Sequence, residues 1–120
     1  MNGFLLVGLG GALGSMARYG AGLVSTRWVG PAFPAGTLAV NLVGSFLMVA
    51  VVTVAGRSGL SDDARLFLTT GVMGGLTTYS AFNAETLGML HERPLVAVGY
   101  IALTVVGCLV AGLVGRAVAS

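Results

Sequence analysis

Polar side chains recur at four-residue spacing within two apolar stretches of the sequence. One set is Thr37, Asn41 and Ser45, and another is Tyr100, Thr104 and Cys108. Because residues four apart lie on one face of a helix, each set predicts a polar stripe along an otherwise apolar helix. A third stretch holds further polar residues, namely Thr69, Thr70, Thr77, Thr78, Ser80, Asn83 and Glu85. A hydrogen bond between helices explains any one of them, but three such sets together favour a polar path.

Most groups on these stripes are hydroxyls and amides, which donate hydrogen bonds without carrying a charge. No lysine or histidine lies in the middle of an apolar stretch, and Glu85 is the only acid inside one. A proton-coupled pump normally carries a central carboxylate or histidine relay. An uncharged path of donors suits a small anion, which must lose its water without binding too tightly to leave.

The third stretch also contains a poor helix interior, because two glycines and a leucine precede two β-branched threonines at residues 74–78. Broken membrane helices expose carbonyl groups that coordinate cations and N–H groups that face anions. An ordinary kink absorbed by packing is the alternative. Tyr79 and Phe82 follow, three residues apart. Their positive ring edges are able to line an anion path, and core packing again explains the pair equally simply.

Four apolar stretches must position these residues, at 3–24, 36–55, 66–90 and 95–114. Charged residues make up 8% of the 120 residues and hydrophobic residues 56%, whereas a soluble domain usually carries about 25% charge. A membrane span needs about 20 apolar residues, and its backbone groups must bond within their own segment, as in a helix. We therefore predict an all-α membrane protein. Residues 1–120 are expected to form one domain of four transmembrane helices, the third of them broken.

Other compositional features narrow the function. Twenty glycines, most of them in apolar stretches, indicate close packing of helices. Gly8 and Gly10 suggest a dinucleotide-binding loop, but Leu13 stands where that motif needs glycine or alanine. The six basic residues are scattered arginines, which is not typical of nucleic-acid binding. The single cysteine excludes an internal disulfide.

The arginines also predict how the spans are oriented. One end of the bundle would carry Arg57, Arg65 and Arg116, and the other Arg18, Arg27 and Arg93. Insertion normally places the arginine-rich end in the cytoplasm, so a tie gives no preferred direction. We therefore predict dual topology, in which copies inserted both ways form an antiparallel homodimer. A weak bias from the α-amino group is the alternative.

Three segments resemble the signatures of the Fluc (CrcB) fluoride channels, in the order found in that family. They are GGALGSMARY at 10–19, GTLAVNLVGSF at 36–46 and GVMGGLTTYSAF at 71–82. The resemblance covers essentially the whole chain. It implies a multi-pass channel, not an enzyme, that exports fluoride passively across the bacterial inner membrane and so relieves fluoride toxicity. It also implies an antiparallel dimer with two fluoride pathways and one central structural sodium ion.

The resemblance further implies roles for individual residues. The carbonyl groups of Gly74 and Thr77 would bind sodium, and Arg18 would have a structural role at the subunit interface. The fluoride pathway would comprise Asn41, Tyr79, Ser80, Phe82, Thr37, Glu85, Tyr100, Thr104 and Cys108. Two of these depart from the family pattern, since Tyr79 replaces a usual phenylalanine and Cys108 a common hydroxyl. Some family members pair different subunits, so a heterodimer with a paralogue is an alternative to the homodimer.

Other protein classes fit the sequence less well. A small multidrug transporter shares the length, spans and dual topology, but its proton exchange needs a carboxylate in the first helix, and residues 3–24 contain none. A helical scaffold explains the glycines but not the polar stripes. An enzyme is the poorest fit, because His91 lies in a loop without a nucleophile nearby in sequence. The expected partners are therefore fluoride, membrane lipid and a second subunit, without nucleic acid.

Overall fold

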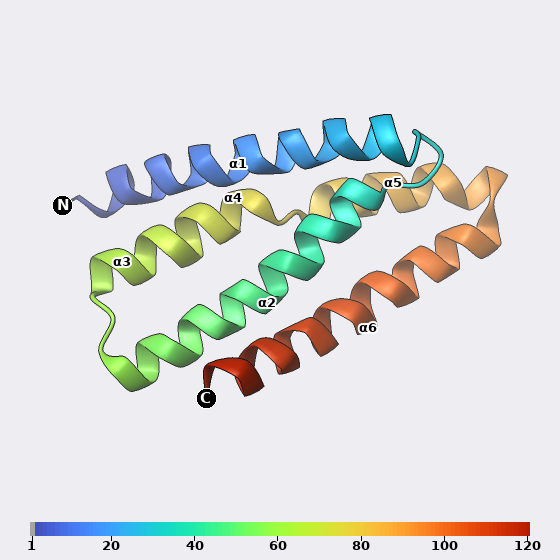
Figure 1. Cartoon of the computed structure of the whole chain (residues 1–120). Coiled ribbons are helices and arrows are strands. Elements are labelled where there is room, and N and C mark those ends of the chain that lie inside the picture. The colour runs from blue at the N-terminus through green and yellow to red at the C-terminus, as the bar shows by residue number, and fades with distance from the viewer. Residues whose placement is uncertain (1) are drawn as a thin grey trace.

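The computed structural model describes residues 2–120, which form helices and no strand. The elements are α1 (Gly3–Trp28), α2 (Ala35–Ser58), α3 (Asp62–Leu66), the π-helix η1 (Phe67–Met73), α4 (Gly74–Leu76), α5 (Tyr79–Glu92) and α6 (Pro94–Ala119). Figure 1 shows α1, α2, α6 and the row from α3 to α5 extending along one elongated body, which measures 48 × 29 × 22 Å. The N-terminus and the α2–α3 connection lie toward one end, and the α1–α2 loop and the α5–α6 turn lie at the other.

Local sequence signals account for where the helices begin and end. The Asn2 side chain accepts a hydrogen bond from the amide of Phe4 at the start of α1. The Ser61 hydroxyl caps α3 in the same way. Such caps satisfy amides that have no partner inside the helix. Gly59 ends α2 with a φ of 71°, a left-handed conformation that glycine adopts without steric cost. Pro94 begins α6, where its missing N–H costs nothing.

Two helices of the described chain, α2 and α6, are each long and apolar enough to cross a membrane. Every 18-residue window of α1 includes Arg18, which lowers the hydropathy of that helix. The third apolar stretch is divided into shorter pieces, the longest of which has 14 residues. By length and composition alone, two spans are therefore supported, and four spans remain a prediction.

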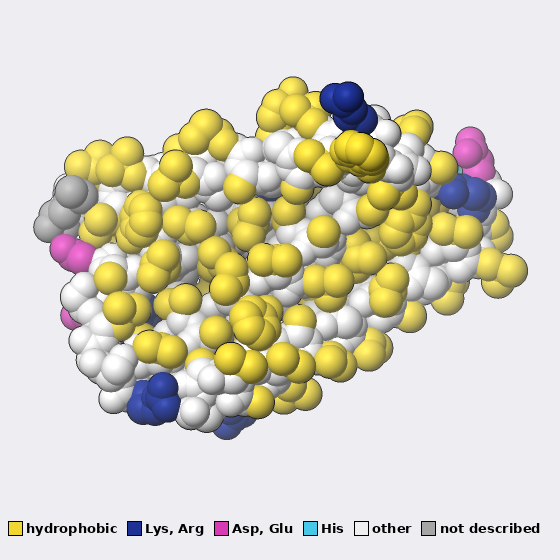
Figure 2. All heavy atoms as spheres, in the orientation of Figure 1, with side chains coloured by type: hydrophobic (Ala, Val, Ile, Leu, Met, Phe, Trp, Pro, Cys, Tyr) yellow, Lys and Arg dark blue, Asp and Glu magenta, His cyan; other side chains and the backbone are white. Residues whose placement is uncertain are grey.

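The surface of the chain is apolar over most of its length. Figure 2 shows hydrophobic side chains covering the visible face, with the charged side chains gathered toward the two ends. Large apolar residues on this surface include Phe4, which is 92% exposed, and Trp28, which is 78% exposed. Apolar exposure on this scale is unfavourable in water. Together with α2 and α6, it indicates a membrane protein.

The predicted break in the third apolar stretch is confirmed. Helix α4 ends at Leu76 and α5 begins at Tyr79, while Thr77 and Thr78 between them are extended, with ψ values of 155° and 124°. The Thr78 hydroxyl then caps α5 by accepting from the amide of Ala81 at 3.2 Å. The π-helix before the break was not predicted. Such wider turns occur often at functional sites.

Glycines let α1 approach the broken row closely. A Cβ atom on Gly10 would lie 2.6 Å from the carbonyl oxygen of Phe67, and one on Gly75 would lie 2.5 Å from that of Gly11. Real Cβ atoms essentially never come this close to another heavy atom. Backbones in contact gain the van der Waals packing that holds membrane helices together. The glycine-rich composition therefore fixes where α1 lies against η1 and α4.

This packing predicts a difference between two neighbouring glycines. Gly10→Ala is expected to destabilise the fold by about 1–3 kcal/mol, because the new methyl group forces backbones apart. Gly8→Ala is the matched control, because no atom lies within 4 Å of a Cβ at that position. Thermal unfolding in detergent measures both. Equal melting temperatures for the two variants would contradict the close packing of α1 on η1.

Candidate functional site

The side chain of Asn41 holds the helix break open. Its Oδ1 atom accepts from the amide of Thr78 at 2.8 Å, and its Nδ2 atom donates to the carbonyl of the same residue at 3.0 Å. In a continuous helix the Thr78 amide would donate to the carbonyl of Gly74. Asn41 therefore replaces the helical partner and frees that carbonyl. Asn41 is only 8% exposed, so these bonds form away from solvent.

Arg18 contacts the other side of the break. Its Nε atom donates to the carbonyl oxygen of Gly75 at 3.1 Å, which joins α1 to α4. This carbonyl would otherwise pair with the amide of Tyr79 in an unbroken helix. A guanidinium group also places a positive charge beside the middle of the broken row. Within one subunit, Arg18 thus stabilises the break.

Aromatic rings surround the start of α5. The ring centroids of Tyr79 and Phe82 lie 5.6 Å apart at an interplanar angle of 73°, an edge-to-face arrangement. Phe82 is 7% exposed and its centroid lies 5.2 Å from that of Tyr100. Tyr79 is 78% exposed, so its ring lies at the surface of the single subunit. The two predicted rings are therefore neighbours, but only Phe82 belongs to the core.

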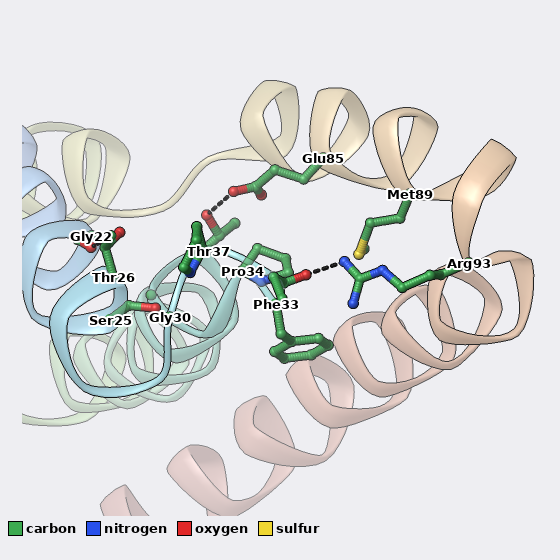
Figure 3. A pocket seen from close by; sticks show the side chains of 13 residues that line it. Gly22, Ser25, Thr26, Gly30, Phe33, Pro34, Thr37, Glu85, Met89 and Arg93 are labelled. Atoms are coloured by element: carbon green, nitrogen blue, oxygen red, sulfur yellow. Dashed lines mark hydrogen bonds between the residues drawn. The ribbon is translucent and has the colours of Figure 1, made fainter.

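A carboxylate links three helices beside these rings. Thr37 of α2 donates its hydroxyl to Glu85 Oε2 at 3.0 Å, and Tyr100 of α6 donates to Glu85 Oε1 at 3.1 Å. Figure 3 shows the bond between Thr37 and Glu85. Each carboxylate oxygen thus has a hydroxyl partner, as a part-buried charge requires. The three residues, all predicted for the pathway, form one network.

A cavity of about 320 Å³ lies between α2, the break, α5 and α6. Its lining residues are Asn41, Ser45, Thr77, Thr78, Tyr79, Phe82, Thr104, Val105 and Cys108. Five of the nine predicted pathway residues therefore line one cavity. Ser80 does not line it, because its side chain is exposed and lies 3.3 Å from the hydroxyl of Thr78.

Thr104 has the clearest sign of a missing partner in this cavity. Its side chain is 7% exposed, and its hydroxyl oxygen has no hydrogen-bond partner within residues 2–120. A buried hydroxyl left without a partner costs about 1–3 kcal/mol. Native proteins rarely keep such a group unless water or a ligand satisfies it. The cavity therefore offers an unused hydrogen-bonding group to a small guest.

A second cavity of about 330 Å³ lies at the end of the molecule that carries the α1–α2 loop. Figure 3 shows Thr37 and Glu85 on one side of it and Arg93 on another. The Arg93 guanidinium donates to the carbonyl of Ala32 and so ties the α5–α6 turn to this loop. Because Glu85 lines this cavity and also binds Tyr100, its carboxylate connects the cavity with the interior of the bundle.

Sequence reasoning missed two contributors. Phe33 lies in the α1–α2 loop, and its ring meets Tyr100 edge to face at a centroid distance of 5.5 Å. A phenylalanine between Pro31 and Pro34 is the signal that could have suggested a loop residue held against the core. The backbone of Thr78 is the second, as the partner of Asn41. Nothing in the spacing of Asn41 points to a contact 37 residues away.

No group of three or more His, Cys, Asp or Glu side chains that could hold a metal ion occurs in the described part of the chain. The predicted sodium ligands are of another kind, since they are the backbone carbonyls of Gly74 and Thr77. Hard cations prefer oxygen ligands of this type. The amide that would occupy the Gly74 carbonyl is bound to Asn41 instead. The donor set therefore fits a hard cation.

An apolar helical surface, a helix broken at its centre and a cavity lined by neutral donors together define a helical membrane protein built around a small polar guest. Residues 5–116 match the family model of the CrcB-like proteins, described as Camphor Resistance (CrcB). The chain therefore belongs to the CrcB family.

Relatives with printed functions are similar over nearly their whole length. A protein of Anaeromyxobacter sp. (strain K), named fluoride-specific ion channel FluC, is 54% identical over 89% of this chain and 86% of its own. A protein of the same name from Sorangium cellulosum (strain So ce56) is 47% identical over 99% and 95%. One from Thermus thermophilus is 48% identical over 76% and 73%.

Proposed function

We propose that this chain is a fluoride-selective channel subunit that lets fluoride leave the bacterial cytoplasm through the inner membrane. The observation that carries the proposal is the buried, unpartnered hydroxyl of Thr104, in a cavity it shares with the amide of Asn41 and the ring of Phe82. The printed function of the relatives supports fluoride as the ion. A channel of this kind moves its ion down a gradient and performs no enzymatic reaction.

The chemistry of the cavity suits a small and strongly hydrated anion. Fluoride gives up its water only if other donors replace it, and hydroxyls and amides do so without the strong attraction of a fixed positive charge. The positive ring edge of Phe82 adds a weak attraction. These groups stabilise the ion enough to enter and leave. Passive export is useful because hydrogen fluoride enters cells as a neutral acid and releases trapped fluoride inside.

The alternative of a proton-coupled multidrug transporter is not favoured. That mechanism needs a carboxylate in the first span, and α1 contains neither aspartate nor glutamate. The acid on α5 is Glu85, and both of its oxygens accept hydrogen bonds from Thr37 and Tyr100. A carboxylate held in this way is not poised to exchange protons with a drug.

The subunits are proposed to span the inner membrane several times and to pair as an antiparallel, dual-topology homodimer. The equal number of arginines near each end supports insertion in both directions. The exposure of Tyr79, whose ring lines the cavity and yet is 78% exposed, supports a second subunit that covers it. Labelling of a C-terminal tag from outside intact cells should reach about half of the copies, and a single fixed orientation would contradict the proposal.

A structural sodium ion is proposed at the centre of this dimer. The carbonyls of Gly74 and Thr77 would hold it, and the bond from Asn41 to Thr78 and that from Arg18 to Gly75 would keep the break in the shape that presents them. When bound, the ion would supply a positive charge between the two subunits. Replacing sodium by a large organic cation should lower the melting temperature of the purified protein, and an unchanged value would argue against the ion.

The direct test of the proposed function is fluoride release from liposomes that contain the purified protein. We expect release measured with a fluoride electrode to be fast, while chloride is retained in the same vesicles. Empty liposomes are the control. Equal release of fluoride and chloride would contradict selectivity, and no release of either would contradict a channel made by this chain alone.

A further inference from the structure

Cys108 lies where two cavities meet. It lines the cavity that contains Asn41 and Thr104, and it also lines a larger groove of about 820 Å³ between α2 and α6. Its side chain is half-buried, and it is the only cysteine in the chain. The groove continues along α6 past Gly112 to Arg116 near the C-terminus. A reagent in the groove therefore reaches the thiol from the side away from Asn41.

A second sulfur atom faces the same groove. Met48 of α2 lines it together with Cys108 of α6, so a thioether and a thiol from opposite walls share one cavity. Thiolate and thioether sulfur are the soft donors that bind monovalent copper and similar thiophilic ions. Other soft or borderline side chains, such as the exposed Met16 and His91, lie outside this groove. The pair is therefore a distinct chemical feature of the pathway wall.

The hydroxyl of Thr104 provides an independent sign that this cavity takes a guest. Thr104 lies four residues before Cys108, on the same face of α6, and lines the same cavity. It is 7% exposed, and within the described chain its oxygen has no partner. Unsatisfied buried groups of this kind usually mark the place of an absent ligand or water. The thiol thus borders a space that is built for occupation.

We infer that Cys108 is a binding site for soft, thiophilic cations such as silver(I), that Met48 is its second donor, and that occupation blocks the pathway. The inference rests on the proposed channel function. In the binding step a sulfur–silver bond forms as the sulfur–hydrogen bond breaks, and the proton leaves to the buffer. No oxidant or reductant is required. The bound ion fills part of the narrow cavity and removes the S–H donor, which hinders the anion in two ways.

The test uses liposomes in chloride-free buffer, to which silver nitrate is added during fluoride release. We expect release by the unaltered protein to fall about tenfold or more, with about one silver ion bound per chain by native mass spectrometry. A thiol chelator added afterwards should restore the release. In Cys108→Ser, silver should leave unchanged whatever release that variant has, and the bound silver should be lost.

Two methionine variants test the second donor. Met48→Leu removes the thioether from the groove, and it should raise the silver concentration for half-inhibition by about tenfold. Met16→Leu is the matched control, because Met16 lies on α1 with 62% exposure and outside the groove. Its half-inhibition should equal that of the unaltered protein. Equal values for both variants would overturn the role of Met48.

Other outcomes separate this inference from the proposed function. Silver bound at Cys108 with undiminished fluoride release would overturn the block, as would equal inhibition of Cys108→Ser. Absence of any selective release before silver is added would instead contradict the channel function. The silver content of Cys108→Ser is measured without flux, so it tests the binding site even if that variant conducts poorly.

Discussion

Asn41→Asp is expected to reduce fluoride release by at least about a hundredfold. A carboxylate in the cavity would repel an approaching anion, and at 4 Å and an effective dielectric of about 20 this repulsion amounts to about 4 kcal/mol. An energy of about 1.4 kcal/mol already changes a rate tenfold. Because Asn41 lines the cavity and is only 8% exposed, water screens this charge poorly.

The same substitution preserves part of the local structure. Aspartate keeps the oxygen that accepts from the Thr78 amide and loses only the donor to the Thr78 carbonyl. The variant should therefore still fold, which gel filtration and thermal unfolding in detergent will measure beside the release assay. Asn83→Asp is the matched control, because Asn83 is exposed and does not line the cavity. Undiminished release by folded Asn41→Asp would exclude Asn41 from the pathway.

Thr104→Val should separate conduction from stability. Valine has nearly the shape of threonine but lacks the hydroxyl, which in Thr104 has no partner in the described chain. Removing an unsatisfied buried group does not destabilise a fold, so the melting temperature should stay the same or rise. If this hydroxyl replaces water around the anion, fluoride release should nevertheless fall about tenfold, the equivalent of one hydrogen bond of about 1.4 kcal/mol.

A nearby threonine supplies the control for this experiment. Thr86 is 8% exposed, and its hydroxyl donates to the carbonyl of Phe82 at 2.7 Å. It does not line the cavity, so Thr86→Val should conduct normally. Unchanged fluoride release by Thr104→Val would show that the hydroxyl is a structural feature and would remove the main support for the proposed function. Equal losses in both variants would indicate a general disturbance of α5 and α6.

The contrast between Asn41 and Thr104 shows what sequence spacing can predict. Both residues were expected in the pathway, and both line the same cavity. Their environments differ, however, because Asn41 is bound at both amide atoms to Thr78, whereas Thr104 has no partner within residues 2–120. Spacing places a side chain on a helix face, but it does not say which atom of a neighbouring helix meets it.

Several features of this protein followed from the sequence alone. The apolar stretches, the polar stripes and the break after Gly74-Gly75 depend on local properties, namely side-chain hydrophobicity, the helical repeat and the poor helix propensity of glycine. Helices extend a few residues beyond the apolar stretches, as α2 does to Ser58, because the backbone continues until a residue such as Gly59 ends it.

Only the tertiary structure decided which of these groups act together. It joined Thr37, Glu85 and Tyr100 into one network and directed Asn41 to the backbone of the break. It also separated Ser80 from the cavity that holds Thr104. The physical reason is that the rotation and height of each helix relative to its neighbours depend on contacts between distant segments, such as that of Gly10 with Phe67, which local periodicity does not encode.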